Sequence, residues 1–269
     1  MNLKNKTFSM VLTAIFGAII LFLSLVPNIG YITIVPGVSI TIIHIPVLVG
    51  IFLLSLSGSI YLGVFFGLGS LMVAFMRAAT PVDEAFKNPL VSVLPRILLA
   101  IITFYLIKFF KKINIIKPGK IILTVIVSLV TGFGIFFGIN EFLRNILADN
   151  YMNYRLIINI GIIVLILAMI VFYIYYIIFK SGKNAYIPSV FIISTFIHTI
   201  LVLSSLLIFK PSAFELMLGE NQTVINLIML IALTNGILEV VIATLIGTPI
   251  VVAIKKKVDD NDDTTIWYW

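Results

Sequence analysis

Eight long runs of apolar residues dominate the sequence, and short polar segments separate them. The runs cover residues 8–26, 40–56, 59–76, 90–107, 121–139, 156–179, 187–209 and 224–254. A helix needs about 20 apolar residues to cross the hydrocarbon core of a bilayer. The pattern therefore predicts an all-α integral membrane protein with eight spans. The second and third runs are short, so their helices are expected to be tilted or packed inside the bundle.

The composition agrees with this pattern. Hydrophobic residues make up 61% of the 269 residues and charged residues only 11%, with a mean hydropathy of +1.20. A soluble fold cannot bury that much apolar surface, whereas a bilayer can. Residues 1–269 are thus expected to form a single transmembrane domain. No small-residue cleavage site follows the first run, which predicts an uncleaved first span.

The basic residues predict how the spans are oriented. Basic residues are enriched in the cytoplasmic loops of membrane proteins. If the spans alternate, both termini are cytoplasmic, and residues 257–269 form a cytoplasmic tail. The positive-inside pattern also explains the net charge of +7, so no nucleic-acid partner is expected. Twelve of the 18 basic residues fall on the cytoplasmic side: Lys4, Lys6, Lys108, Lys111, Lys112, Lys117, Lys120, Lys180, Lys183, Lys255, Lys256 and Lys257.

The first outer loop is not a simple linker. Residues 27–43 combine turn residues with a β-branched run, which predicts an extended segment or a hairpin. Pro46 suits the first turn of the helix that follows. Elsewhere, Gly63 with Gly67 and Gly134 with Gly138 have the spacing that lets helix backbones pack closely.

Motifs for catalysis or ATP hydrolysis are missing from the sequence. There is no cysteine, which excludes a cysteine nucleophile and an iron–sulfur cluster. Gly119-Lys120 lacks the upstream glycine and the following Ser or Thr of a phosphate-binding loop. Zinc-protease and serine-hydrolase motifs are also missing. The chain is therefore predicted to be no enzyme and to carry no cofactor or metal.

Four polar residues interrupt the predicted spans: Arg96, His198, Asn235 and Glu239. Such residues usually face a cavity or a partner, because burying them in lipid is costly. At a rise of about 1.5 Å per residue, Arg96 lies about 9 Å and Asn235 about 16 Å below the outer ends of their spans. Glu239 follows one turn deeper on the same face. We expect these residues, with Asn88 in the outer loop, to line one substrate pocket.

Each of these residues also has a simpler interpretation. Arg96 and Glu239 would pair with each other whatever the function, because buried charges are usually paired. In the binding interpretation, Arg96 binds a carboxylate or phosphate of the substrate through its bidentate guanidinium. Asn235 donates and accepts hydrogen bonds with hydroxyl or amide groups of the substrate. His198 is as often a hydrogen-bonded packing residue, and His44 is expected at the outer end of the second span, bonded to loop backbone.

Four stretches resemble a known family, the substrate-binding S components of the energy-coupling factor (ECF) vitamin transporters. The pantothenate-type members are the most similar. Span one contains Ala14-Ile-Phe-Gly-Ala18, similar to the family's AxxxA motif. The second stretch is Ile43-His-Ile-Pro-Val-Leu-Val-Gly50, together with the glycines that follow it as far as Gly67. The third is Val93-Leu-Pro-Arg-Ile97, and the fourth is Thr234-Asn-Gly-Ile-Leu-Glu239 followed by Ile246-Gly-Thr-Pro-Ile250.

The resemblance implies a fold and a mechanism. It implies a bundle of six core spans, with residues 8–112 as the first four, 186–256 as the last two, and 113–185 as a two-span insertion. The alternative is that one of the eight runs is not a true span. The chain would bind a vitamin from outside and dock through Ala14 and Ala18 on a transmembrane coupling subunit, which two ATPase subunits drive. Pantothenate is favoured, and pyridoxine, hydroxymethylpyrimidine and riboflavin are alternatives.

Two other classes of protein are alternatives for this sequence. A membrane-embedded enzyme would use His44, His198 and Glu239 as metal ligands or acid–base groups, and these would have to lie within a few ångströms of one centre. The predicted spans place the two histidines at different depths, which disfavours that class. A self-sufficient secondary transporter would favour inverted repeats and interrupted helices at the midplane, and the sequence has no convincing internal repeat.

Overall fold

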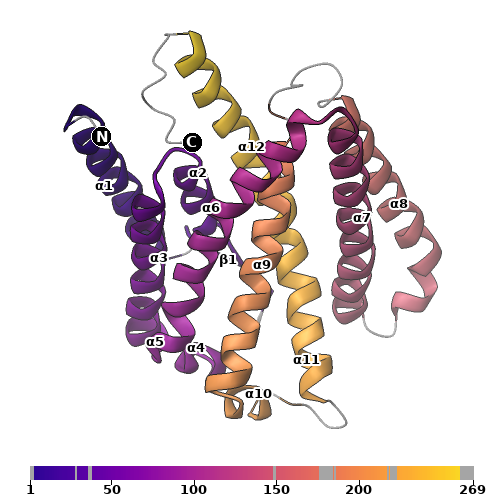
Figure 1. Cartoon of the computed structure of the whole chain (residues 1–269). Coiled ribbons are helices and arrows are strands. Elements are labelled where there is room, and N and C mark those ends of the chain that lie inside the picture. Colours follow the sequence, from indigo (N-terminus) through magenta and orange to yellow (C-terminus); the bar gives the residue numbers. More distant parts are fainter. Residues whose placement is uncertain are drawn as a thin grey trace.

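The chain folds into a bundle of long helices that lie side by side (Figure 1). The computed structural model describes residues 3–27, 29–35, 38–147, 150–175, 184, 186–216, 218 and 223–260. The long helices are α1 (Leu3–Leu25), α3 (Leu56–Arg77), α6 (Leu94–Ile115), α7 (Lys117–Leu147), α8 (Tyr151–Tyr175), α9 (Tyr186–Phe209) and α12 (Ile237–Asp260).

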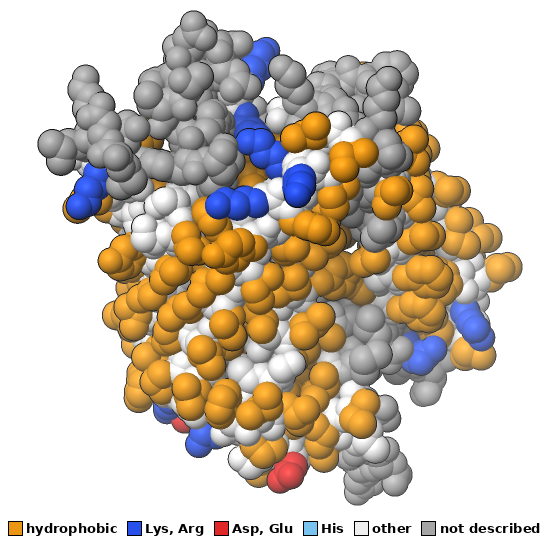
Figure 2. All heavy atoms as spheres, in the orientation of Figure 1, with side chains coloured by type: hydrophobic (Ala, Val, Ile, Leu, Met, Phe, Trp, Pro, Cys, Tyr) orange, Lys and Arg blue, Asp and Glu red, His pale blue; other side chains and the backbone are white. Residues whose placement is uncertain are grey.

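Six stretches within the described residues are long and apolar enough to cross a membrane. Their surface is largely apolar, and Figure 2 shows hydrophobic side chains covering the middle of the visible face. Helices suit such an environment because they satisfy every backbone N–H and C=O within the segment. The predicted multi-pass, all-α membrane bundle is therefore confirmed. The six stretches are Lys6–Leu25, Leu56–Arg77, Pro89–Ile115, Tyr151–Val171, Tyr186–Phe209 and Ile237–Lys256.

The prediction of a spanning helix over residues 40–56 is wrong. The helix in this run, α2 (His44–Ile51), has eight residues, or about 12 Å, and it is too short to cross a bilayer. An antiparallel hairpin precedes it, formed by β1 (Tyr31–Val35) and β2 (Val38–Thr41), as the β-branched loop predicted. Seven of the eight α2 residues are buried, so their apolar character reflects the protein core and not lipid contact.

The two ends of the bundle differ in charge. At one end α1 begins and α6 and α12 end (Figure 1), and the lysines there include Lys108, Lys112 and Lys255. We call this the basic end, and Figure 2 shows Lys and Arg side chains gathered over it. At the other end, charges of both signs mix. Lys180, Lys183 and residues 261–269 of the predicted tail lie outside the described residues.

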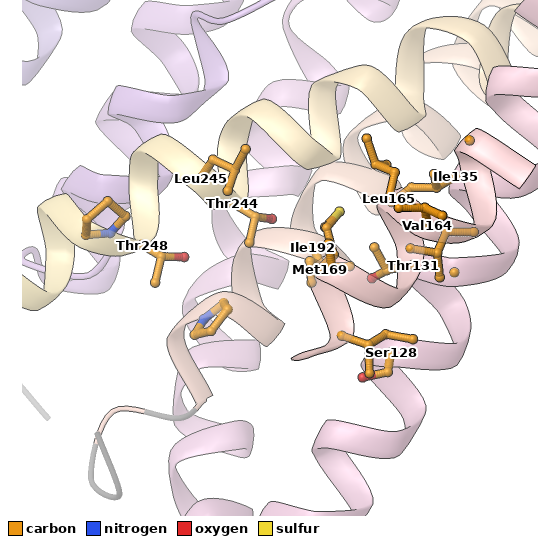
Figure 3. Close-up of a pocket in the computed structure, with 17 residues that line it drawn as sticks. Ser128, Thr131, Ile135, Val164, Leu165, Met169, Ile192, Thr244, Leu245 and Thr248 are labelled. Carbon is orange, nitrogen blue, oxygen red and sulfur yellow. The ribbon is translucent and has the colours of Figure 1, made fainter. Parts of the chain in front are cut away.

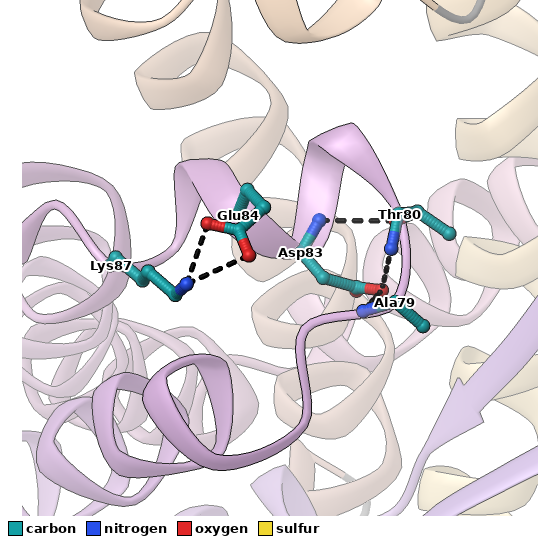
Figure 4. A network of polar contacts seen from close by, with 5 residues as sticks. All are labelled: Ala79, Thr80, Asp83, Glu84 and Lys87. Atoms are coloured by element: carbon teal, nitrogen blue, oxygen red, sulfur yellow. Dashed lines mark hydrogen bonds and ion pairs between the residues drawn. The ribbon is translucent and has the colours of Figure 1, made fainter.

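Short helices close the mixed-charge end between α3 and α6. The helix α4 (Pro81–Ala85) begins with a capping box: the Asp83 N–H donates to Thr80 Oγ1 at 3.1 Å, and the Thr80 N–H donates to Asp83 Oδ2 at 2.9 Å. Glu84 and Lys87 form an ion pair beside it (Figure 4). Next comes α5 (Pro89–Ser92), which leads directly into α6. This compact connection fixes where α6 starts, and therefore where Arg96 lies.

Helices α3 and α6 pack closely at Gly63 and Gly67, one of the two glycine pairs for which the sequence predicted close packing. A Cβ added to Gly63 would lie 2.7 Å from the carbonyl oxygen of Arg96, and one added to Gly67 would lie 2.7 Å from the Cα of Val93. Any larger residue would therefore push the two backbones apart. This close contact brings the first turn of α6 against the middle of α3.

The remaining helices complete the bundle. At the mixed-charge end, α10 (Ser212–Glu215) contacts α4, and α11 (Val224–Ile231) leads into a π-helical turn, η3 (Ala232–Gly236), and then into α12. The helices α7 and α8 pack on each other, and α7 also contacts α9, η3 and α12. Figure 1 shows this α7–α8 pair at the edge of the bundle. The run predicted over 224–254 is thus one helical traverse with a π turn inside it.

Candidate functional site

Five polar side chains from five elements meet inside the bundle, and we call them the polar cluster. His44 starts α2, Arg96 lies in the first turn of α6, His198 lies in the middle of α9, and Glu239 lies in the first turn of α12. These four are between 0% and 6% exposed. Tyr31 of β1 is half-buried, and its hydroxyl hydrogen-bonds with Ser70. The structure therefore brings together Arg96, His198 and Glu239, as the sequence predicted.

The two histidines stack on each other, so the prediction that they lie at different depths is wrong. Their ring centroids are 5.7 Å apart with an interplanar angle of 20°. The nearest ligand atoms of His44, His198 and Glu239 all lie within 4.8 Å of one another. The prediction failed because it treated the second run as a span. The hairpin and the short α2 instead carry His44 into the bundle, to the level of His198.

Among the described residues, the ring nitrogens of both histidines lack a hydrogen-bond partner of good geometry, although the Thr41 backbone approaches the His44 ring. The Phe66 ring also packs against His198, with centroids 5.4 Å apart. Buried polar atoms normally have partners, because leaving one unpaired costs about 1–3 kcal/mol. These nitrogens are therefore candidates for contact with a ligand.

Arg96 is held by aromatic rings and by one backbone carbonyl. Its guanidinium carbon lies 5.4 Å from the Phe66 centroid and 5.0 Å from the Phe86 centroid. The Arg96 Nη1 donates to the Val91 carbonyl at 2.7 Å, while its Nε has no partner. Cation–π contacts of this kind stabilise a desolvated guanidinium without neutralising its charge.

A direct Arg96–Glu239 ion pair was the simpler prediction for these two residues. Within the described part of the chain no such contact falls below 4.0 Å, although Glu239 is close enough for its charge to act on Arg96. Glu239 Oε1 instead accepts a hydrogen bond from the Thr41 N–H at 2.8 Å. This bond ties the end of the hairpin to α12. Arg96 therefore keeps its charge available for another anion.

The π-helical turn η3 comes directly before Glu239 and contains Asn235. Asn235 is half-buried and is one turn from Glu239, as its spacing predicted. A Cβ added to Gly236 would lie 3.1 Å from Thr199 Oγ1, so η3 packs closely on α9. Single π turns inside α-helices are frequent at functional sites. The turn shifts the register of the helix directly before Glu239.

The other predicted residues lie away from this centre. Asn88 caps α5, since its Oδ1 accepts from the Leu90 N–H at 3.0 Å. Ala14 and Ala18 are exposed on one face of α1, among the large exposed residues Val11 and Ile15. The sequence analysis missed Tyr31, Phe66 and Phe86. Only Phe66 lies in a span, where aromatic residues are common, whereas Tyr31 lies in the hairpin and Phe86 follows α4. Nothing in their spacing indicates that they meet.

A separate cavity of about 670 Å³ lies between the α7–α8 pair and helices α9 and α12 (Figure 3). Its lining is apolar apart from the hydroxyls of Ser128, Thr131, Thr244 and Thr248, and it includes none of the predicted substrate-binding residues. A charged ligand needs a charged or strongly polar partner. We therefore take the polar cluster, and not this cavity, as the candidate site for a polar solute.

Ionisable side chains buried among membrane spans are typical of membrane proteins that handle polar solutes or ions. No family model matches the chain. Part of it is similar to the pantothenate transporter PanT of Leuconostoc mesenteroides subsp. mesenteroides, with 36% identity over 102 residues. The match covers 37% of this chain and 50% of PanT, so the chain spans about half the length of the curated relative it matches. This partial match and the six apolar helices fit an ECF S component.

Proposed function

We propose that this chain is the substrate-capture subunit of an ATP-driven ECF-type importer in the cell membrane, and that it binds pantothenate from outside. The observation that carries this proposal is the buried Arg96, which forms no ion pair within 4.0 Å among the described residues, beside two histidines whose ring nitrogens have no hydrogen-bond partner of good geometry there. The similarity to a pantothenate transporter supports the choice of vitamin.

The polar cluster has the groups that an anionic, hydroxylated vitamin requires. Arg96 offers its unpartnered Nε to a carboxylate. Each neutral imidazole has one donor and one acceptor nitrogen, which suits hydroxyl and amide groups. Asn235 and Glu239 lie one turn apart on the facing helix and add an amide and a carboxylate. In this proposal the carboxylate of the vitamin lies at Arg96 and its hydroxyls lie towards the histidines.

The proposed orientation follows from the charge at the two ends of the bundle. The basic end faces the cytoplasm, because cytoplasmic segments are enriched in Lys and Arg. The mixed-charge end, with α4, α5 and α10, then faces outward. Arg96 lies near this outer end, and the hairpin bonded to Glu239 covers the cluster from the same side. A vitamin would thus reach the cluster from outside, beneath the hairpin.

A binding panel on the purified chain tests the substrate. The full chain in detergent would be titrated by calorimetry with pantothenate, pyridoxine, hydroxymethylpyrimidine and riboflavin. We expect saturable binding of pantothenate at about one molecule per chain and no binding of the other three. Tight binding of one of the other vitamins instead would assign the site to that vitamin, and no binding of any would contradict the proposal.

The coupling step is proposed to use the exposed face of α1. Ala14 and Ala18 leave a smooth strip there, and small residues let two helices pack closely in lipid. A transmembrane coupling subunit would dock on this strip, and two ATPase subunits bound to that subunit would supply the energy.

Substitution of this strip separates binding from uptake. Ala14→Trp or Ala18→Trp is expected to abolish ATP-driven uptake in cells and to leave the affinity of the isolated chain for pantothenate unchanged. Ile200→Trp is the matched control, since Ile200 is 60% exposed on α9, away from the strip. Normal uptake by both alanine variants would reject the docking role of α1.

A further inference from the structure

We propose that His44, His198 and Glu239 form a binding site for one divalent transition-metal ion, with Zn²⁺ as the best fit. The three side chains come from α2, α9 and α12 and are 0%, 5% and 6% exposed. One ligand atom from each lies within 4.8 Å of the other two. This inference does not depend on which vitamin the chain binds.

The donor set suits zinc. Two imidazole nitrogens and one carboxylate are the protein ligands of a common class of zinc site, which keeps a fourth position open. Zinc–ligand bonds of about 2.0–2.1 Å place tetrahedral ligand atoms about 3.3 Å apart. The separations in the cluster are at most 4.8 Å. To close that difference, the two imidazole rings must turn out of their stacked arrangement, so that one nitrogen of each points at the ion.

The surroundings of the three groups resemble the outer shell of a metal site. Ligating carboxylates and imidazoles are usually held by further hydrogen bonds. Here the Thr41 N–H donates to Glu239 Oε1 at 2.8 Å, the Thr41 side chain also hydrogen-bonds to Glu239, and the Thr41 backbone approaches His44. All four imidazole nitrogens lack a partner with good geometry. A bound ion would satisfy one nitrogen of each ring.

The positive charge of Arg96 repels a cation at this site. Arg96 shares the Phe66 ring with His198 and lies close enough to Glu239 for their charges to interact. Glu239 offsets part of this repulsion. The rest is offset if an anion takes the open fourth position, where it would contact the metal and Arg96 together. The site is therefore expected to favour a metal ion with an anion bound to it, such as hydroxide or a carboxylate.

Metal titration of the full chain tests this site. The protein would be purified in detergent with any histidine tag removed, treated with a chelator, and titrated with Zn²⁺ by calorimetry. In parallel, Co²⁺ would replace Zn²⁺ so that its visible absorption reports coordination geometry. We expect about one ion per chain and an intense four-coordinate Co²⁺ spectrum. A second Zn²⁺ titration in the presence of acetate should show tighter binding.

Variants link the ion to the three residues. His198→Ala and Glu239→Gln should each weaken Zn²⁺ binding by at least about tenfold, and Glu84→Gln, an exposed carboxylate paired with Lys87, should not change it. Absence of saturable Zn²⁺ binding by the unmodified chain would overturn the proposal, as would a weak, six-coordinate Co²⁺ spectrum. An equal loss in Glu84→Gln would overturn it too.

The metal site and the vitamin site can fail separately. Pantothenate affinity would be measured on the same preparation, with chelator and with Zn²⁺. Pantothenate binding in a chain that does not bind Zn²⁺ would overturn the metal site and leave the proposed function standing. Zn²⁺ binding in a chain that binds no vitamin would do the reverse.

Discussion

The core of the bundle and the α7–α8 pair are both apolar, yet they use their apolar residues differently. In the most apolar 18-residue stretch of Pro89–Ile115, 50% of the residues are buried inside the protein. In the corresponding stretch of Tyr151–Val171, only 6% are buried. In the core, α6 approaches α3 so closely that Gly63 has no room for a Cβ. In the pair, a Cβ at Gly161 would meet nothing within 4 Å.

This difference teaches where polar chemistry can be placed in the membrane. An ionisable side chain is tolerated there when neighbouring helices shield it from lipid. Helices α2, α3, α6, α9 and α12 provide that shielding for the polar cluster. Helix α8 instead exposes most of its apolar residues, and the α7–α8 pair borders an apolar cavity. Substrate binding should therefore depend on the core and be insensitive to changes in the pair.

The largest effect is expected from Arg96→Ala in the core. The substitution removes a charge-assisted hydrogen bond to the ligand carboxylate, worth roughly 1.5–3 kcal/mol. Pantothenate affinity should fall at least about tenfold, since about 1.4 kcal/mol corresponds to one decade. Arg96→Lys should restore part of it, because a point charge cannot reproduce the guanidinium fork. Calorimetry on the purified variants measures both.

Matched changes in the pair and a double variant sharpen this prediction. Ser128→Ala and Thr131→Ala, which alter hydroxyls of the apolar cavity, should leave pantothenate affinity unchanged. Because no described ion pair joins Arg96 to Glu239, the double variant Arg96→Met with Glu239→Leu should bind no better than Arg96→Ala. Retained binding in the double variant would show that the ligand is neutral and that Arg96 only balances Glu239.

An intermediate effect is expected from adding one methyl group in each region. Gly63→Ala forces α3 away from α6 and should destabilise the chain by about 1–3 kcal/mol, as overpacking usually does. Gly161→Ala meets open space and should be neutral or stabilise by up to about 1 kcal/mol. Thermal melts of the two variants in one detergent compare them directly. Equal melting temperatures would mean that the core is not packed more tightly than the pair.

The sequence predicted the membrane bundle because lipid imposes a length and a polarity on every span. It failed at residues 40–56 because an apolar run has the same composition whether it faces lipid or a protein core. A lipid-facing span and a buried core helix differ here only in the length of α2. That length depends on the residue at which the hairpin ends. Tyr31 was missed although the hairpin was predicted, because the sequence does not show which hairpin side chains reach the buried charges.

The candidate site was predictable to a similar degree. Arg96, His198 and Glu239 stood out because ionisable residues are rare in apolar helices. Counting residues along straight spans did not predict the π turn that contains Asn235 and shifts its register relative to Glu239. The same counting placed His44 wrongly, because the chain reaches it through a hairpin that re-enters the bundle. Contacts such as those of Phe66 and Phe86 with Arg96 depend on tertiary packing, which the local sequence does not encode.

The smallest effect is expected at Asn88, which the sequence analysis assigned to the substrate and the structure shows as the cap of α5. Loss of a helix N-cap costs about 1 kcal/mol of stability, so Asn88→Ala should lower the melting temperature slightly. Asn88→Ser should keep it, because serine also caps helices well. Since Asn88 Oδ1 already accepts from the Leu90 N–H, pantothenate affinity should be the same in both variants. A cap-preserving serine variant that still loses affinity would show that the Asn88 amide contacts the vitamin, and would extend the binding site from the buried cluster to the outer surface of the core.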